Sequence, residues 1–512
     1  MKIAGLDIGT TGCKCTVFDE QGKDLGKAYR DYPVRRAVGS HEIDVSAVME
    51  SVYAVIRKMS EAYPDIGGLG VTSFGETFVL TDGEGNPLHP AMLYTDPRGS
   101  EECRELTERL GAESIARITG LRPHEMYSIC KLMWIKKHQP KIWHAARHVF
   151  QMEDYVVFHL TGKAQIDYSL ATRTMAFDIH TLDWSAQVLE AAGIDRGLFS
   201  VCVPTGSPAG AILPAAAERT GLSGRTLIVS VSHDQVAAAV GAGAFDGSVA
   251  VDGAGTVECL IPVYDAMPDM DRMYKGYFSI VPYVVPGTYV AYAFSYTGGA
   301  LIQWCAEKLA GGALIQWCAE KLAGGAQEQA QKLGLSVNEL LERTYLEKGN
   351  AGPGSLLVLP HFAGAATPYM DTGSRGVILG LTTESTAADI YRGCMEGVAY
   401  EMYLNYQALA QTGIHFEKLH ATGGGARSAV WMQMKADVLN LPITALKTMD
   451  AGTVGSAMLT GVAIGVFRDL KEAAEHMVEK TVTYMPRQDM HEQYMQVYER
   501  YCRIYEAVRP LV

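Results

Sequence analysis

Residues 2–18 read KIAGLDIGTTGCKCTVF, and this opening stretch carries the first sign of the fold. Two short apolar runs, 2–6 and 13–18, stand on either side of a turn made of glycine and threonine. Apolar runs of this length, bounded by turn residues, predict two β-strands joined by a tight turn. The stretch therefore does not resemble a signal peptide, because Asp7 interrupts its apolar run too early.

A second stretch, SVAVDGAGTVECLIPV at 248–263, repeats this order of features. An apolar strand, an aspartate, small residues and a Gly-Thr pair again precede an apolar strand, although Asp252 and Thr256 lie one residue further apart than Asp7 and Thr10. The two stretches are either unrelated hairpins or the starts of two domains of similar construction. We expect an N-terminal domain over 1–246 and a C-terminal domain over 247–512.

Short strand-like runs alternate with longer helical runs along the whole chain, which is typical of an α/β protein. A chain of 512 residues also exceeds the usual size of one hydrophobic core, so two or more domains are expected. Further strands are predicted at 68–73 and 226–231, and helices at 46–62, 132–137, 236–243 and 387–409.

The composition excludes several classes of function. With 44 basic and 57 acidic residues the formal charge is −13, which disfavours a nucleic-acid partner. No apolar run approaches the ~18–20 residues of a membrane span. The ten cysteines are scattered without zinc-site spacing, so we expect free thiols in the reducing cytoplasm.

An exact tandem repeat interrupts the second half of the chain. GGALIQWCAEKLA occupies 298–310 and recurs at 311–323. Thirteen residues turn a helix so far that the two copies would face about 140° apart, and the Gly-Gly pair between them disfavours one continuous helix. We expect one copy to pack in the fold and the other to form an added turn-helix or loop, so that deleting 311–323 leaves the melting temperature nearly unchanged.

Three segments carry residues suited to phosphate chemistry. In DIGTT at 7–11, a tight turn with backbone amides and threonine hydroxyls suits phosphate oxygens, and Asp7 could hold Mg²⁺ through water. The same turn could simply satisfy its own backbone. No Walker-type GK[ST] sequence follows it.

Asp234 stands in SHDQ at 232–235, after an apolar run and before the small-residue run VAAAVGAG. A carboxylate at a strand end that opens a helix lies where α/β folds place ligand groups. It could accept the proton of an attacking hydroxyl in phosphoryl transfer. Because aspartate is also a favoured helix N-cap, the residues alone leave both roles open.

The third segment, TGGGARS at 422–428, lies at a strand-to-helix junction where three glycines allow a flat ring or a phosphate to approach the backbone. As a plain loop it would be unremarkable in any protein. Asp450 then precedes a small-residue helix expected at 454–465, and it is most simply the N-cap of that helix.

Taken together and in order, these segments resemble the FGGY family of carbohydrate kinases over essentially the whole chain. The resemblance rests on DIGTT, MLYTDPR at 92–98, MYSICKLMWIKKH at 126–138, FDIHTLDWS at 177–185, SHDQVAAAVGAG at 232–243, GTVE at 255–258, RGVILGL at 375–381 and GGGARSAVWMQMKADVLNLPI at 423–443. It implies two ribonuclease-H-like domains of the actin and hexokinase type that flank a catalytic cleft. The sugar would lie against the first domain and ATP against the second.

The resemblance also implies roles for individual residues. Asp234 would be the catalytic base, and Asp7 would position Mg²⁺. The sugar site would comprise Glu76, Thr77, Asp96, Tyr127, His233, Asp234 and Gln235. The ATP site would comprise Gly9, Thr10, Thr11, Lys14, Gly255, Thr256, Gly424, Gly425, Ala426 and Ser428.

Departures from the family pattern concern the sugar. Xylulose kinases usually have Met-His where this chain has Glu76-Thr77, and glycerol kinases have Arg-Glu where it has Gly75-Glu76. The segment 423–437 is most similar to the xylulose branch, which favours a ketopentose such as xylulose. Alternatives are another polyol or sugar acid, gluconate- or glycerol-like. Two hypotheses belong to other functional classes. One is a catalytically silent relative that binds sugar or nucleotide, and the other is another ATPase of the actin-like fold. A cytoplasmic kinase that forms a homodimer is compatible with the resemblance.

Overall fold

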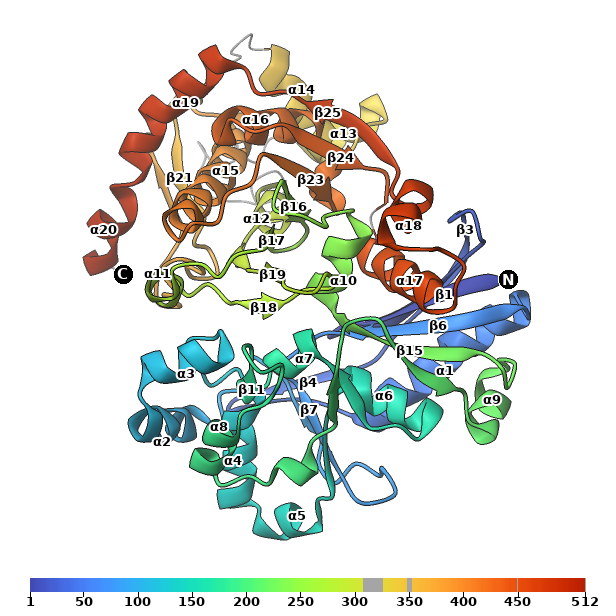
Figure 1. The fold of residues 1–512 in the computed structure, drawn as a ribbon. Helices are drawn as coiled ribbons and strands as arrows, with labels where there is room; N and C mark the ends of the chain where they lie inside the picture. The colour runs from blue at the N-terminus through green and yellow to red at the C-terminus, as the bar shows by residue number, and fades with distance from the viewer. Residues whose placement is uncertain (307–325, 348–351, 449, 512) are drawn as a thin grey trace.

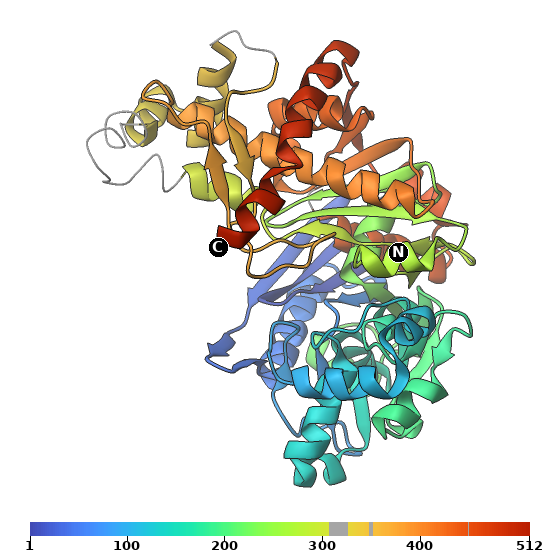
Figure 2. The same cartoon turned by 90° about the vertical axis from the view of Figure 1, so that its left-hand side faces the viewer.

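The chain folds into two lobes that lie one above the other in a computed structural model (Figures 1 and 2). The structure describes residues 1–306, 326–347, 352–448 and 450–511. The segments up to about residue 245 build the lower lobe of Figure 1, and the later segments build the upper lobe. The second copy of the tandem repeat, 311–323, and the end of the first lie outside the described residues, so the expectation for them stays a prediction.

The lower lobe contains a six-stranded sheet in the order β14-β15-β6-β1-β2-β3. β1 pairs antiparallel with β2 and β2 with β3, whereas β6 and β15 run parallel to β1. This confirms the strands expected at 2–6, 13–18, 68–73 and 226–231, each with slightly different ends. Their bounds are β1 Lys2–Ile8, β2 Gly12–Phe18, β3 Asp24–Asp31, β6 Ile66–Ser73, β14 Ser207–Ala211 and β15 Leu227–His233.

The upper lobe repeats this arrangement. β16 pairs antiparallel with β17, and β23 and β24 follow in parallel on the other side of β16. The similarity between the two sequence stretches therefore reflects one topology used twice, and the alternative of two unrelated hairpins is wrong. The strands are β16 Val249–Ala254, β17 Glu258–Tyr264, β23 Lys418–Thr422, β24 Ile443–Leu446 and β25 Lys480–Tyr484.

Two small-residue helices join the lobes at their centre. α10 (Asp234–Gly241) and α17 (Ala451–Ala463) cross with their backbones in contact, since a Cβ on Gly455 would lie 1.8 Å from the Ala237 carbonyl oxygen. α17 also packs against β1, where a Cβ on Gly5 would meet the Thr453 carbonyl oxygen at 2.3 Å. In Figure 1, α17 lies beside α10 and β1. A helix from the end of the chain thus packs on the first sheet.

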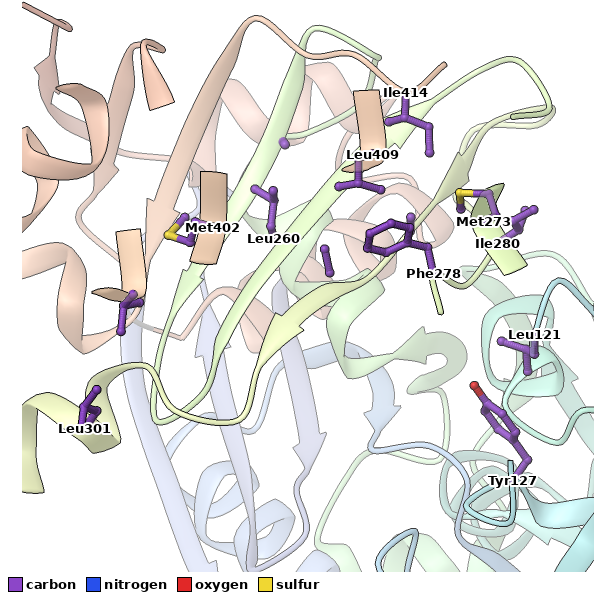
Figure 3. Packing of buried hydrophobic residues seen from close by; sticks show 14 of the residues in the cluster. Leu121, Tyr127, Leu260, Met273, Phe278, Ile280, Leu301, Met402, Leu409 and Ile414 are labelled. Atoms are coloured by element: carbon purple, nitrogen blue, oxygen red, sulfur yellow. The ribbon is translucent and has the colours of Figure 1, made fainter. Parts of the chain in front are cut away.

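The lobes also meet at the side opposite α17. Ile280 donates its amide hydrogen to the Gly120 carbonyl at 2.8 Å, and a buried apolar cluster continues across this contact. Figure 3 shows Leu121 and Tyr127 of the lower lobe facing Phe278 and Ile280 of the upper lobe. The candidate active site lies between these two contacts.

The expected helices are present, with shifted ends. They are α1 Val45–Ala62, α4 Ser128–His138, α10 Asp234–Gly241, α15 Ala387–Gln411 and α17 Ala451–Ala463. Within the described ranges, no helix combines the length and the apolarity needed to cross a membrane.

Candidate active site

Asp234 is the first residue of α10 and directly follows strand β15. Because β15 and β6 run parallel to β1, their carboxyl ends meet at one edge of the sheet, beside the β1–β2 turn. The N-cap position of α10 belongs to His233. Asp234 is therefore not the cap of its helix, and the alternative of a purely structural cap is wrong.

The surroundings of Asp234 favour proton transfer near neutral pH. Burial, followed by the charges of Asp7 and Glu76, raises the pKa of the Asp234 carboxyl to about 7. Its Oδ1 has no hydrogen-bond partner among the described residues. His233 Nε2 lies 3.2 Å from this oxygen, but burial and the charge of Arg173 lower the pKa of His233, so its ring is neutral at pH 7. A carboxyl group with such a pKa is suited to general-base catalysis.

Asp234 lines a cavity of about 270 Å³ between the lobes. This cavity brings together six of the predicted site residues: Thr10, Glu76, Tyr127, His233, Asp234 and Gln235. The upper lobe contributes Cys259, Tyr292 and Phe294 to the same wall. The resemblance implied a sugar site against the first domain, and the wall of this cavity also includes residues of the second half of the chain.

Two predicted sugar-site residues, Thr77 and Asp96, do not line this cavity. The Asp96 carboxylate accepts hydrogen bonds from the Arg98 side chain and from the His41 amide. Burial opposes ionisation of Asp96, but these bonds outweigh it and lower its pKa. Thr77 is fully buried and donates its amide hydrogen to Gly75 O at 2.7 Å.

Among the lining residues that sequence reasoning missed are Arg173 and Tyr292. The buried Arg173 guanidinium forms an ion pair with Glu76, and the Tyr292 hydroxyl lies 3.2 Å from His233 Nδ1. Arg173 lies 97 residues from Glu76, and Tyr292 lies 59 residues from His233. No local motif points to either residue.

The β1–β2 turn presents Asp7 and Thr10 at the same edge of the sheet. The Gly9 amide donates to Gly12 O at 2.9 Å, which leaves Thr10 and Thr11 at the tip of the turn. Thr10 lines the cavity and Thr11 is exposed. Burial raises the pKa of Asp7, while the charge of Lys14 counteracts this.

Mg²⁺ fits the chemistry of this edge. The charge of Asp450 disfavours ionisation of the buried Asp7, and the charge of Asp7 in turn disfavours ionisation of Asp234. A divalent cation held by Asp7 would relieve this repulsion. Within the described residues, no group of three or more His, Cys, Asp or Glu side chains could hold a metal. Mg²⁺ commonly binds through one or two carboxylates together with water and substrate phosphates, and Asp7 is the carboxylate beside the turn.

Lys14 bridges the lobes. Its Nζ donates to Asp450 Oδ1 at 2.6 Å, and Lys27 Nζ lies 3.1 Å from Asp450 Oδ2. Asp450 occupies the N-cap position of α17, as expected, but its side chain makes no capping hydrogen bond. Lys14, predicted to bind the nucleotide, is thus engaged by a carboxylate of the upper lobe.

A second cavity, of about 1050 Å³, lies in the upper lobe. Five of the residues predicted to contact ATP line it, namely Gly255, Thr256, Gly424, Gly425 and Ser428, whereas Ala426 does not. The wall also includes Asn338 and Glu342 of α14 (Val337–Glu347), which the motifs did not indicate. The volume of this cavity lies at the upper end of the range of small-molecule and cofactor sites, so it is large enough for a nucleotide.

The β16–β17 loop separates the two cavities. Thr256 lines the larger cavity, and the next residue, Val257, lines the smaller one. Behind the loop, the fully buried Lys435 Nζ donates to Asp252 Oδ2 at 2.8 Å and also to Glu258 Oε1. This ion cluster, Asp252–Glu258–Lys435, holds the two strand ends that carry the loop.

Comparison with known families decides the identity of these two lobes. The model of the N-terminal domain of the FGGY family of carbohydrate kinases matches residues 2–241, and the model of its C-terminal domain matches residues 272–464.

The chain belongs to the FGGY family of carbohydrate kinases.

The FGGY relatives differ in substrate. The chain is 24% identical to the xylulose kinase of Bacillus subtilis, over 99% of this chain and 97% of that protein. It is 29% identical to the glycerol kinase of Bordetella parapertussis, over 94% and 92%. Its fold is similar to that of gluconate kinase from Lactobacillus acidophilus, with a TM-score of 0.87, 21% identity and coverage of 99% and 98%.

Membership in the FGGY family confirms the predicted fold of two actin- and hexokinase-like domains and the predicted class of enzyme, a carbohydrate kinase. It removes the alternative of an actin-like chaperone. The specific sugar is a separate question, because the named relatives act on different acceptors.

Proposed function

We propose that this FGGY kinase phosphorylates a hydroxyl of a ketopentose, such as xylulose, with ATP and with Asp234 as the catalytic base. The observation that carries the proposal is the position of Asp234. Its carboxylate, with a pKa of about 7, lines the smaller cavity, which one loop separates from the nucleotide-sized cavity. A sugar hydroxyl in the first cavity and a γ-phosphoryl group beside the loop would meet at this point.

The reaction requires one proton acceptor and an aligned acceptor hydroxyl. As the sugar oxygen attacks the γ-phosphorus, its O–H bond breaks and the proton moves to Asp234 Oδ1. The bond between the γ-phosphorus and the bridging oxygen breaks at the same time, and ADP leaves. Since phosphoryl transfer depends mainly on positioning and charge neutralisation, the protein has little other covalent chemistry to perform.

The remaining residues have supporting roles in this proposal. Thr10, Thr11 and the backbone of Gly9 would face the transferred phosphoryl group, and Gly255 and Thr256 would contact the phosphates from the other side. Asp7 would hold Mg²⁺, which neutralises phosphate charge when bound. His233 is neutral and lies beside Asp234, so it leaves the carboxylate as the base.

The choice of a ketopentose rests on xylulose kinases among the relatives and on the segment 423–437. Glycerol is a weaker candidate, because Gly75 stands where glycerol kinases have arginine. A homodimer and a location in the cytoplasm stay predictions from the sequence.

The test is a screen for ADP release over pentuloses, pentitols, aldonic acids and glycerol, with Asp234→Asn as the control. We expect a pentulose to give the highest kcat/KM and the variant to lose that activity. If no acceptor raises turnover above that of the variant, the proposal fails.

A further inference from the structure

Arg173 lines the smaller cavity, which is called the acceptor cavity from here on because the proposed function places the sugar there. No motif and no comparison gives Arg173 a role. It follows helix α7 (Tyr168–Thr172), and only 6% of it is exposed. Its Nε donates to Glu76 Oε1 at 2.7 Å, and Nη2 donates to the same oxygen. Nη1 is buried and has no hydrogen-bond partner among the described residues. A buried donor without a partner is destabilising, so a bound ligand is the natural source of its acceptor.

The backbone around Gly75 makes room for this guanidinium. A Cβ on Gly75 would lie 2.8 Å from Arg173 Cγ, so a larger residue there would displace the arginine. Glu76 has a φ of 62°, and the Thr77 amide donates to Gly75 O, which together form a γ-turn of the rare, strained type. Strain of this kind persists at functional sites, where the surrounding structure enforces it. Here it directs the Glu76 carboxylate onto Arg173.

Aromatic rings from both lobes fix the guanidinium. Its Cζ lies 5.3 Å from the ring centre of Tyr127 and 5.5 Å from that of Tyr292. Tyr292 in turn contacts His233, the neighbour of Asp234. Groups of both halves of the chain therefore hold Arg173 in place. One of them, Tyr292, also contacts the residue that precedes Asp234.

The charge balance of the cavity indicates what Arg173 binds. Glu76 neutralises the guanidinium, and Asp234 adds a further negative charge when it is ionised. The other basic side chains on the wall are Arg122, His124 and His233. Arg122 is stacked on the Tyr277 ring at 3.7 Å and donates to a backbone carbonyl at 3.2 Å. Next to Arg173, a carboxylate on the acceptor would therefore lie beside the negative charges of Glu76 and of ionised Asp234.

We infer that Arg173 donates from Nη1 to an uncharged oxygen of the acceptor, a hydroxyl or a keto oxygen, and that the Glu76–Arg173 pair selects neutral sugars against sugar acids. This inference rests on the proposed function and adds the residue pair that sets its substrate class. Arg173 is thus a specificity-determining residue that contacts substrate.

The test compares kcat/KM for a ketopentose and for an aldonate of similar length in purified full-length variants. Glu76→Gln keeps the size of the side chain but leaves the guanidinium charge unpaired. We expect it to raise the ratio of kcat/KM for the aldonate to kcat/KM for the ketopentose by ~10-fold or more, because an unpaired buried arginine binds carboxylates strongly. Arg173→Lys should raise KM for the ketopentose more than it lowers kcat, because lysine lacks the planar fork.

A matched control uses the buried pair Arg392–Glu396, whose Nε–Oε1 distance is also 2.7 Å and which lines neither cavity. Glu396→Gln should leave the ratio unchanged. A rise in melting temperature on adding ADP would show that each variant is folded. The double variant Glu76→Gln/Arg173→Met, which removes both charges of the pair, should lose preference for either acceptor.

An unchanged or lower ratio in folded Glu76→Gln would overturn the inference. So would a wild-type protein that prefers the aldonate, although the kinase proposal would then survive. If no acceptor supports turnover in the wild-type protein, the proposed function and the inference both fail.

Discussion

At the scale of single residues, the environment of Asp234 controls the protonation of this proposed catalytic base. Burial and two nearby carboxylates disfavour its charged form, so the carboxyl is about half protonated near pH 7. A carboxyl group with a pKa near the working pH is ionised in a large fraction of molecules and still binds the proton well enough to act as a general base.

The first prediction concerns pH. Because only ionised Asp234 accepts a proton, kcat/KM for the acceptor should rise about tenfold per unit below its pKa and level off above about pH 8. Initial rates between pH 5.5 and 8.5 measure this. The affinity for ADP, which depends on the other cavity, serves as the control. A flat kcat/KM profile with unchanged protein folding would contradict the assignment.

The second prediction separates activity from stability at the same residue. Asp234→Asn should lower kcat by roughly 10²–10⁴. The folded-state pKa of Asp234 is raised, so ionisation destabilises the native state as the pH rises from about 4 through 7. Asparagine lacks this penalty, and the variant should gain up to ~4 kcal/mol in free energy of unfolding at pH 8 and almost nothing at pH 4. Urea titrations at both values measure the gain; an equal effect at both would refute the charge argument.

At the scale of secondary-structure elements, backbone contact between α10 and α17 connects the lobes. Helix propensity alone predicts that Gly455→Ala in the interior of α17 stabilises the protein by ~1 kcal/mol. The contact with the Ala237 carbonyl predicts the reverse sign.

We therefore expect Gly455→Ala to lower the free energy of unfolding by ~1–3 kcal/mol or more, since overpacking forces the helices apart. Chemical denaturation provides the measurement. Gly224→Ala is the control, because a Cβ at Gly224 would have no atom within 4 Å. A stabilised Gly455→Ala protein would show that the helices do not touch in this way.

The Asp252–Glu258–Lys435 cluster is the second element-scale feature. Lys435→Met would leave two buried carboxylates without a cation beneath the β16–β17 loop. Loss of one partner of a buried ion pair typically destabilises a protein by ~3–5 kcal/mol, and we expect weaker ADP binding as the loop loosens.

Calorimetry with ADP and thermal melts measure these effects. Lys447→Met is the matched control, because its pair with Glu479 is exposed and should contribute less than ~1 kcal/mol. Equal effects of the two substitutions would exclude a special role for the cluster.

At the scale of the whole molecule, the acceptor cavity has walls from both lobes, with Asp234 on one and Tyr292 on the other. Ligands that contact both lobes favour the conformation in which the lobes are closest. Closure would also exclude water, which competes with the sugar as nucleophile.

We predict that Asp234→Asn, saturated with ketopentose and MgATP, is more compact than the free protein. Small-angle X-ray scattering should give a smaller radius of gyration. Each ligand at 100 times its Kd should also add ~2.7 kcal/mol of stability. The sugar alone and the nucleotide alone are the comparison states; identical scattering in all four states would argue against closure.

Much of this architecture follows from local sequence patterns. The strand–turn–strand units at both domain starts and the helices at 46–62 and 387–409 are confirmed within two residues at each end, because apolar periodicity and turn residues act over short stretches. The position of Asp234 after a buried strand was also visible, although only the structure showed that His233 takes the N-cap position.

Local patterns in the sequence were enough to predict the order of the motifs and the residues at the strand ends and turns. The repeated topology of the two lobes, and which of those residues meet, became apparent only in the folded chain. Arg173 reaches Glu76 across 97 residues, and Lys14 reaches Asp450 across 436. Such pairs depend on how whole lobes pack, which no local pattern encodes. The acceptor cavity, and with it the choice of sugar, is therefore a property of the packed molecule.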